Sequence, residues 1–257
     1  MIKTITTRSK IIILKSLIKR NIIFRALLLI FDPINLINKI KNYKKDKHKV
    51  SEINWEERTD KFGKYGVIST ETPQEDFNYV TKLQKKILFS NLKKFVTGKE
   101  KNILDFGCGC GRFTGELSKI SHKSNVLGCD PEKKLISFAQ PKKRVKYIVL
   151  KNLNQIKPKF DIIFISNVLG GIQIKNLNKL RNFLISKLKK DGILFLSEHI
   201  TNTNTKNNRI EILKGWAFRR DNFYLSLFKK INLSKVDEYS YNGYRTSVYI
   251  STRKKKY

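Results

Sequence analysis

Short apolar runs recur at regular intervals between residues 103 and 197, and segments with helical spacing of apolar residues separate them. Runs of four to eight apolar residues are typical of strands, whereas apolar residues three or four positions apart are typical of helices. Regular alternation of the two predicts a parallel sheet with right-handed crossovers and helices on both faces. The predicted strands cover 103–106, 125–130, 145–150, 160–165 and 193–197.

The helices predicted around these strands include one over 77–96, which ends before Gly98, and one that is closed by Asp191-Gly192. The second carries its apolar face on Leu177, Leu180, Leu184 and Leu188.

The end of the chain departs from this alternation. A helix is predicted over 221–233 and strands over 236–241 and 247–251, with Asn242-Gly243 between the strands. Asn-Gly between two apolar segments is a strong hairpin signal. The predicted fold is therefore α/β, with a Rossmann-like, doubly wound, mostly parallel sheet that ends in an antiparallel hairpin.

Three glycines at alternate positions, Gly107, Gly109 and Gly111, follow the first predicted strand. Glycine lets the backbone turn tightly and lets a ligand approach where a Cβ would collide. In open parallel sheets, ligands bind at the carboxyl ends of the strands. A nicotinamide-binding domain would place its third glycine at position 112, where this chain has Arg112, so the spacing speaks against that class.

Asp130 ends the second predicted strand, 25 residues after Asp105. An acid at this place can accept hydrogen bonds from both ribose hydroxyls of an adenosine-containing ligand. The alternative is an acid at the N-terminus of a helix that begins at Pro131-Glu132.

Together, these motifs resemble the class I S-adenosylmethionine-dependent methyltransferases, over roughly residues 77–252. The resemblance implies a seven-stranded sheet with one late antiparallel strand and S-adenosyl-L-methionine as the cofactor. It also implies a set of cofactor-binding residues, namely Asp105, Gly107, Cys108, Gly109, Gly111, Asp130, Pro131 and Asn167.

Two positions depart from the family pattern. Lys151-Asn152 stand where many relatives have an acid near the adenine, and Gly170-Gly171 stand where many small-molecule methyltransferases have Glu-His. We therefore transfer no adenine contact from the family, and the resemblance does not define the acceptor side.

The expected activity is transfer of a methyl group to a small-molecule or sugar/glycan acceptor at a hydroxyl oxygen. His199 follows the last core strand and is the candidate general base, because a histidine with a pKa near 6.5 can take the proton of a hydroxyl. The alternative for His199 is a hydrogen bond within a loop. Trp216, Arg219, Arg220 and Tyr224 are candidates for the wall of the acceptor site.

The net charge of +33 keeps a second function open, methylation of RNA through a basic surface. Solvated lysine faces explain the same charge without nucleic acid. A third alternative is a methyltransferase-like module without catalysis.

The three cysteines, Cys108, Cys110 and Cys129, are too few for a disulfide framework and lack a fourth ligand at zinc spacing. We expect no metal site and a reducing compartment.

Residues 1–50 form a basic, apolar extension before the methyltransferase domain, predicted over 51–257. Lys15, Lys19, Arg20 and Arg25 interrupt its apolar runs, and each charge at the centre of a membrane helix costs about 2.5–3.5 kcal/mol. Peripheral contact with an anionic membrane through residues 1–31, a mitochondrial presequence and a helical appendage on the domain are the alternatives. The expected location is cytoplasmic. If residues 1–31 contact the membrane, the protein is expected at its inner face.

Overall fold

A computed structural model describes residues 53–69, 72–201, 211–213, 215–241 and 243–251. The predicted N-terminal extension, with its three alternatives, lies outside the described residues. Within the described part of the chain, no helix is long and apolar enough to cross a membrane.

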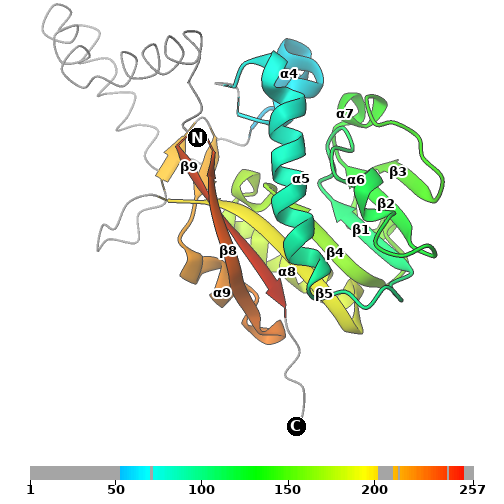
Figure 1. The fold of residues 1–257 in the computed structure, drawn as a ribbon. Coiled ribbons are helices and arrows are strands. Elements are labelled where there is room, and N and C mark those ends of the chain that lie inside the picture. The colour runs from blue at the N-terminus through cyan, green and yellow to red at the C-terminus, as the bar shows by residue number, and fades with distance from the viewer. Residues whose placement is uncertain (1–52, 70–71, 202–210, 214, 242, 252–257) are drawn as a thin grey trace, which may run out of the picture. The chain divides into compact units, whose positions relative to one another are not determined.

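The central element is a seven-stranded sheet with the strand order β3-β2-β1-β4-β5-β9-β8 (Figure 1). Strands β1 to β5 are parallel to one another, and β9 is antiparallel to both β5 and β8. This topology confirms the predicted fold class, including the terminal hairpin. The strands are β1 Asn102–Phe106, β2 Asn125–Asp130, β3 Val145–Val149, β4 Phe160–Ser166, β5 Leu188–Ile200, β8 Leu233–Tyr241 and β9 Tyr244–Ser251.

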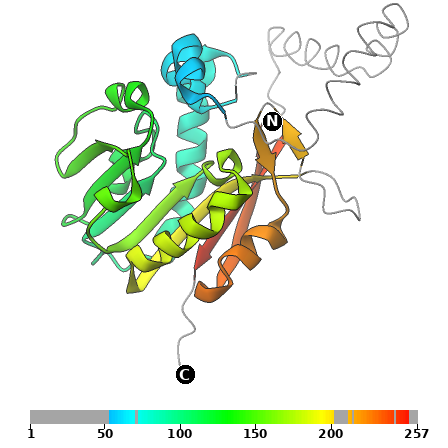
Figure 2. The same ribbon diagram turned by 180° about the vertical axis from the view of Figure 1, so that it is seen from behind.

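Helices cover both faces of the sheet. Helix α5 lies on one face in Figure 1, and the reverse view of Figure 2 shows α8 and α9 on the other. The described helices are α4 Trp55–Phe62, α5 Phe77–Lys93, α6 Thr114–Leu117, α7 Lys133–Ser137, α8 Ile174–Lys187 and α9 Asp221–Leu227. Short 3-10 helices are η2 Gly63–Val67, η3 Gln74–Asp76, η4 Leu153–Gln155, η5 Leu169–Gly171 and η6 Lys229–Ile231.

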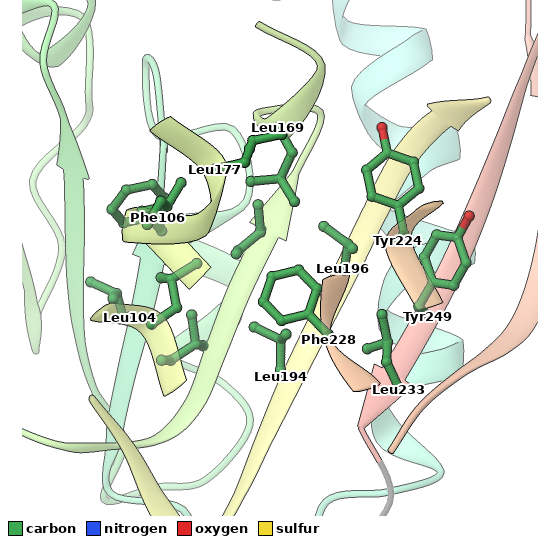
Figure 3. Close-up of a cluster of buried hydrophobic side chains, with 14 of the residues drawn as sticks. Leu104, Phe106, Leu169, Leu177, Leu194, Leu196, Tyr224, Phe228, Leu233 and Tyr249 are labelled. Carbon is green, nitrogen blue, oxygen red and sulfur yellow. The ribbon is translucent and has the colours of Figure 1, made fainter. Parts of the chain in front are cut away.

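Side chains that alternate along the central strands belong to two hydrophobic layers, one on each face of the sheet. On β4, Ile163 packs toward α8 and α9, whereas Ile162 and Phe164 pack toward α5. Figure 3 shows the first layer, in which Tyr224 and Phe228 meet the leucines of the strands. Because both faces are covered, the strands read as continuous apolar runs in the sequence.

Several predicted boundaries were wrong: the helix over 77–96 ends at Lys93, and the two strands of the hairpin begin at Leu233 and Tyr244. The largest differences are at β5 and at the helix before β8. Strand β5 begins at Leu188, which pairs with Phe160, and an irregularity follows before Ile193 pairs with Ile162. The residues expected to close the preceding helix, Asp191 and Gly192, therefore lie within the strand. The helix predicted over 221–233 is interrupted after Leu227, because a 3-10 turn leads into β8.

A small second sheet was not predicted. It pairs β6 Glu211–Leu213 with β7 Trp216–Phe218 in antiparallel fashion. No strand or helix was predicted between residues 198 and 220.

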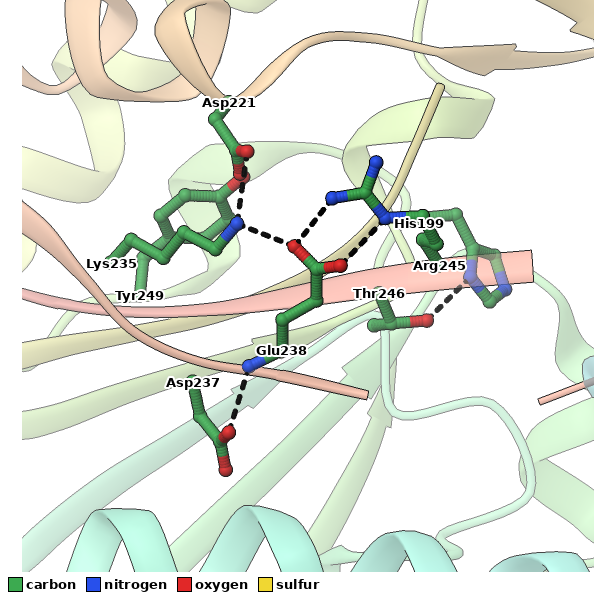
Figure 4. Close-up of polar contacts among 8 residues, drawn as sticks. All are labelled: His199, Asp221, Lys235, Asp237, Glu238, Arg245, Thr246 and Tyr249. Atoms are coloured by element: carbon green, nitrogen blue, oxygen red, sulfur yellow. Dashed lines mark hydrogen bonds and ion pairs between the residues drawn. The ribbon is translucent and has the colours of Figure 1, made fainter. Parts of the chain in front are cut away.

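Charged and hydroxyl side chains join the terminal hairpin to α9 (Figure 4). Tyr249 donates a hydrogen bond of 2.5 Å to Asp221, and Lys235 lies 3.0 Å from the same carboxylate. Lys235 also pairs with Glu238 at 2.6 Å, and Arg245 binds Glu238 through two nitrogens. This network ties β8 and β9 to the start of the helix that covers them.

Replacing Tyr249 by phenylalanine removes the donor to Asp221 and keeps the buried ring. We expect the free energy of unfolding to fall by about 1–2 kcal/mol, since a buried hydrogen bond to a charged group is lost. Urea denaturation measures the difference. Tyr79→Phe is the control, because Tyr79 is 65% exposed, and equal stability of the two variants would contradict a stabilising role for the bond.

Candidate active site

The glycine loop leaves β1 at Phe106 and is held by the end of the neighbouring strand. The N–H groups of Gly107 and Cys108 both donate to the carbonyl of Cys129, at 2.8 and 3.0 Å. The N–H of Gly109 donates to Oδ2 of Asp130 at 2.9 Å. The end of β2 thus shapes the loop through its backbone and its acid together.

Gly107 shows why this loop needs glycine. Its φ angle is +72°, and a Cβ there would lie 2.5 Å from Cγ2 of Val168. Both the left-handed backbone and the close approach exclude larger residues. The loop is therefore packed directly against the segment that follows β4.

Two buried carboxylates flank the loop. Asp130 accepts from Gly109 with one oxygen and from the N–H of Glu132 with the other, at 2.9 Å each. The helix after β2 uses Glu132 as its N-cap, so Asp130 itself does not cap it. Burial raises the pKa of Asp130, and these two backbone donors oppose that effect.

Asp105, the last polar residue of β1, is buried beneath the loop. It accepts a hydrogen bond of 2.6 Å from the Thr114 hydroxyl. Burial raises the pKa of Asp105 to about 7, an effect that the Thr114 hydrogen bond opposes. The bond joins the end of β1 to the start of α6, which lie on either side of the glycine loop.

A cavity of about 220 Å³, here called the loop cavity, opens above these residues. Seven of the eight predicted cofactor-binding residues line it: Asp105, Gly107, Cys108, Gly109, Asp130, Pro131 and Asn167. Gly111 does not, since its backbone packs against Tyr147, whose hydroxyl would lie 2.6 Å from a Cβ. The predicted set therefore converges on one place, with Gly111 shaping the loop from outside the cavity.

Residues far from the glycine loop complete the cavity. Trp55 from the start of α4 and Val67 from the end of η2 both line it, as does Leu150 after β3. No spacing rule links these positions to the motif. Only the change toward aromatic and acidic residues after position 55 marked that segment in the sequence.

A second cavity of about 110 Å³, here called the aromatic cavity, adjoins the first. Both cavities are lined by Trp55, Val67, Arg112 and Asn167. The aromatic cavity is also lined by the predicted base and by four more aromatic residues: His199, Trp216, Phe218, Tyr241 and Tyr244.

His199 sits within this aromatic group. Its Nδ1 lies 2.8 Å from the Thr246 hydroxyl on β9 (Figure 4), and its ring lies 6.0 Å from that of Phe218 and 5.7 Å from that of Tyr244. Burial lowers its pKa from 6.5 to about 4. The imidazole is therefore neutral at neutral pH and presents one ring nitrogen as an acceptor.

Glu198, the residue before it, holds the segment after β4. Its fully buried carboxylate accepts from the N–H groups of Val168, Leu169 and Gly170, at 2.8, 2.7 and 3.2 Å. Burial raises the pKa of Glu198 to about 7, against the effect of these donors and of the nearby Arg219. Glu198 is thus held by the segment after β4, next to His199 on β5.

The residues proposed as an acceptor wall separate in the structure. Trp216 lines the aromatic cavity, whereas Tyr224 is fully buried in the core and lines neither cavity. Arg219 is only 2% exposed and donates to the carbonyls of Leu169 and Ile172, at 2.7 and 2.9 Å. Its role is to hold η5 from the side opposite Glu198.

Size alone does not identify the site. A larger hollow of about 580 Å³ lies between α8 and α9, lined by Arg181, Arg220 and Phe223 among others. None of the predicted cofactor-binding residues lines it.

The sequence matches the model of a family described as a methyltransferase domain, over residues 79–235. The match covers more than half of the chain, and the chain belongs to this family. The match confirms the methyltransferase family that the sequence motifs predicted.

Two curated relatives illustrate the range of the similarity. Carboxy-S-adenosyl-L-methionine synthase of Nautilia profundicola is 29% identical over 126 residues, which cover 47% of this chain and 53% of that protein. Malonyl-[acyl-carrier protein] O-methyltransferase of Bacillus cereus is 30% identical over 123 residues, 45% of each chain. The chain thus spans about half the length of these relatives.

Among solved structures, the magnesium protoporphyrin IX methyltransferase of Synechocystis with bound SAH has a TM-score of 0.56 and 15% identity. The match covers 84% of this chain and 99% of that one. The two proteins share the fold.

The packing of Trp216 on Gly170 predicts a position-specific effect of added volume. A Cβ at Gly170 would lie 2.0 Å from Nε1 of Trp216, whereas one at Gly171 would come no closer than 3.3 Å to the same ring. We expect Gly170→Ala to lower the free energy of unfolding by about 1–3 kcal/mol, because the indole must move. Urea denaturation of both variants tests this, with Gly171→Ala as the matched control. Equal losses would show that Trp216 does not rest on Gly170.

Proposed function

We propose that this methyltransferase acts on a hydroxyl oxygen of a small molecule that binds in the aromatic cavity while S-adenosylmethionine occupies the loop cavity. The observation that carries the proposal is the adjacency of the two cavities, which share four lining residues. An acceptor in one can reach a cofactor in the other without leaving the protein interior. The name of the Bacillus cereus relative, an O-methyltransferase, supports oxygen as the accepting atom.

The lining of the loop cavity fits the cofactor. Each oxygen of Asp130 receives one backbone N–H, and a carboxylate has further lone pairs with which to accept from the ribose hydroxyls. Asn167 lines the cavity, and its buried Oδ1 has no hydrogen-bond partner among the described residues. A donor such as the cofactor's ammonium group would satisfy it.

When bound, S-adenosylmethionine supplies a methyl group on a sulfonium, which is already a good leaving group. The chain's contribution is to orient the acceptor, an effect that can be worth about 7–11 kcal/mol, and to take its proton. In the tautomer whose Nδ1–H donates to the Thr246 hydroxyl, Nε2 can accept the hydroxyl proton as the oxygen gains the methyl group. Aromatic side chains around it exclude water.

An activity screen with labelled cofactor tests the proposal. Hydroxylated small molecules, sugars, lipids and RNA are incubated separately with the purified protein. We expect transfer of label to a hydroxylated small molecule. Label found only in RNA would contradict the proposal, and so would cofactor binding without transfer to any hydroxylated compound.

Asp130→Asn should weaken binding of S-adenosylhomocysteine, measured by calorimetry. An amide cannot receive both backbone donors and the ribose as a carboxylate does, so we expect about a 10- to 100-fold loss, equivalent to 1.5–3 kcal/mol. Asp161→Asn is the matched control, since Asp161 lies at the amino end of β4 and pairs with Lys189. Unchanged affinity in Asp130→Asn would refute the ribose assignment.

His199→Ala should lower kcat by about 10²- to 10⁴-fold, the usual contribution of a general base. Affinity for S-adenosylhomocysteine should not change, because His199 does not line the loop cavity. In the wild type, the acidic limb of the kcat/KM profile should fall near pH 4 rather than near 6.5, as the lowered pKa requires. A full-rate His199→Ala enzyme would remove the base assignment.

A further inference from the structure

The aromatic cavity has an unusual charge balance. Among the described residues, its lining contains two guanidinium groups, Arg58 and Arg112, and neither aspartate nor glutamate. Neither arginine forms an ion pair within the described part of the chain. The cavity therefore offers positive charge without a carboxylate to balance it.

Arg58 is committed to the local backbone. Its Nε donates to the carbonyl of Gly66 at 2.6 Å, and its Nη2 donates to that of Ile68 at 2.9 Å. The side chain ties the end of η2 to α4. This structural role accounts for its position.

Arg112 is the cation of this cavity that has no carboxylate partner among the described residues. Its Nε donates to the Thr81 hydroxyl at 3.0 Å, and its Nη2 donates to the side-chain oxygen of Gln84. Both partners are neutral, and they use two of the five N–H groups of a guanidinium. Rings of Phe77 and Phe113 lie 5.6 and 4.8 Å from its central carbon.

Burial makes this arrangement costly without an anion. It lowers the pKa of Arg112 to about 10, which still leaves the group charged at neutral pH. Arg112 is partly buried, and a charge that is hydrogen-bonded but not paired in such a place carries part of the desolvation cost uncompensated, which a bound oxyanion would offset.

The surroundings of Arg112 favour the acceptor side over the cofactor side. Although Arg112 lines both cavities, its partner Gln84 lines only the aromatic cavity. Tyr241, whose hydroxyl interacts electrostatically with the guanidinium, also lines only that cavity.

The remaining walls are flat aromatic surfaces. Phe218 and Tyr244 stack at 5.5 Å with an angle of 17° between their planes, and Phe218 stacks on His199. Trp216 meets His199 edge to face. Such surfaces pack well against a planar ring.

We propose that the acceptor is a planar aromatic compound that carries a carboxylate, with its ring against the aromatic walls and its carboxylate on Arg112. This inference rests on the proposed function, because it assigns the aromatic cavity to the acceptor. It narrows the substrate class from hydroxylated small molecules to hydroxylated aromatic acids.

Binding, rather than turnover, tests the proposal. The two tryptophans of the chain, Trp55 and Trp216, both line the cavity, so intrinsic fluorescence reports occupancy. The protein is saturated with S-adenosylhomocysteine and titrated with hydroxybenzoates and hydroxynaphthoates, each beside its neutral primary amide. We expect the acids to bind about 10- to 100-fold more tightly than the amides, as for a charge-assisted hydrogen bond.

Arg112→Gln should bring the affinity of the acids down to that of the amides, and any loss of affinity for S-adenosylhomocysteine should be smaller than this loss. Arg112→Lys should recover part of the preference, because it keeps the charge and loses the fork. Arg181→Gln, in the hollow between α8 and α9, is the matched control and should behave as the wild type. Thermal melts show that each variant is folded.

Three results would overturn the proposal: equal affinity of acids and amides in the wild type, no binding of any aromatic acid at millimolar concentration, or a selective loss of S-adenosylhomocysteine affinity in Arg112→Gln. The last result would assign the guanidinium to the cofactor's carboxylate. A different result would show that the proposed function is wrong while the binding proposal holds: aromatic acids would bind tightly, but no label would be transferred to any of them.

Discussion

The carboxylate of Glu198 and the three backbone N–H groups that converge on it form the interaction on which both cavities depend. The segment held in this way runs from Val168 to Gly170, and Val168 lines the loop cavity. Val168 packs on Gly107 of the glycine loop, and Gly170 supports the indole of Trp216. Arg219 binds the same segment from the other side. The buried Glu198 therefore fixes both Val168, which packs on the glycine loop, and Gly170, on which Trp216 of the aromatic cavity rests.

Burial then gives the polar groups of the two cavities different properties. In the loop cavity, Asp130 is surrounded by backbone donors, which suit an acid that must accept further hydrogen bonds. In the aromatic cavity, the pKa of His199 falls and the imidazole is neutral, while Arg112 keeps its charge. The cavity thus contains a neutral base, His199, and a cation without a carboxylate partner among the described residues, Arg112. These two groups favour an anionic substrate, as proposed above.

Much of the fold was predictable because each strand is a continuous apolar run, and such runs are local properties of the sequence. The bounds predicted for β2 agree with the structure, and the Asn242-Gly243 signal gave the hairpin of β8 and β9 correctly. The start of β5 was missed because Leu188 continues the helical spacing of α8 and also pairs with Phe160. The small sheet of β6 and β7 was missed because its strands are three residues each, too short for a periodic pattern.

For the site, the sequence by itself determined the glycine loop, its acids and the class of cofactor, since these lie within one motif and the strand that follows it. The tertiary structure decided the acceptor side. Trp55, Trp216 and Tyr244 come from the two ends of the described chain and meet only when β9 inserts beside β5. Glu198 and Arg112 carry no local signal of their roles. Their partners lie about 30 positions away, and burial, which no spacing reveals, gives them their chemistry.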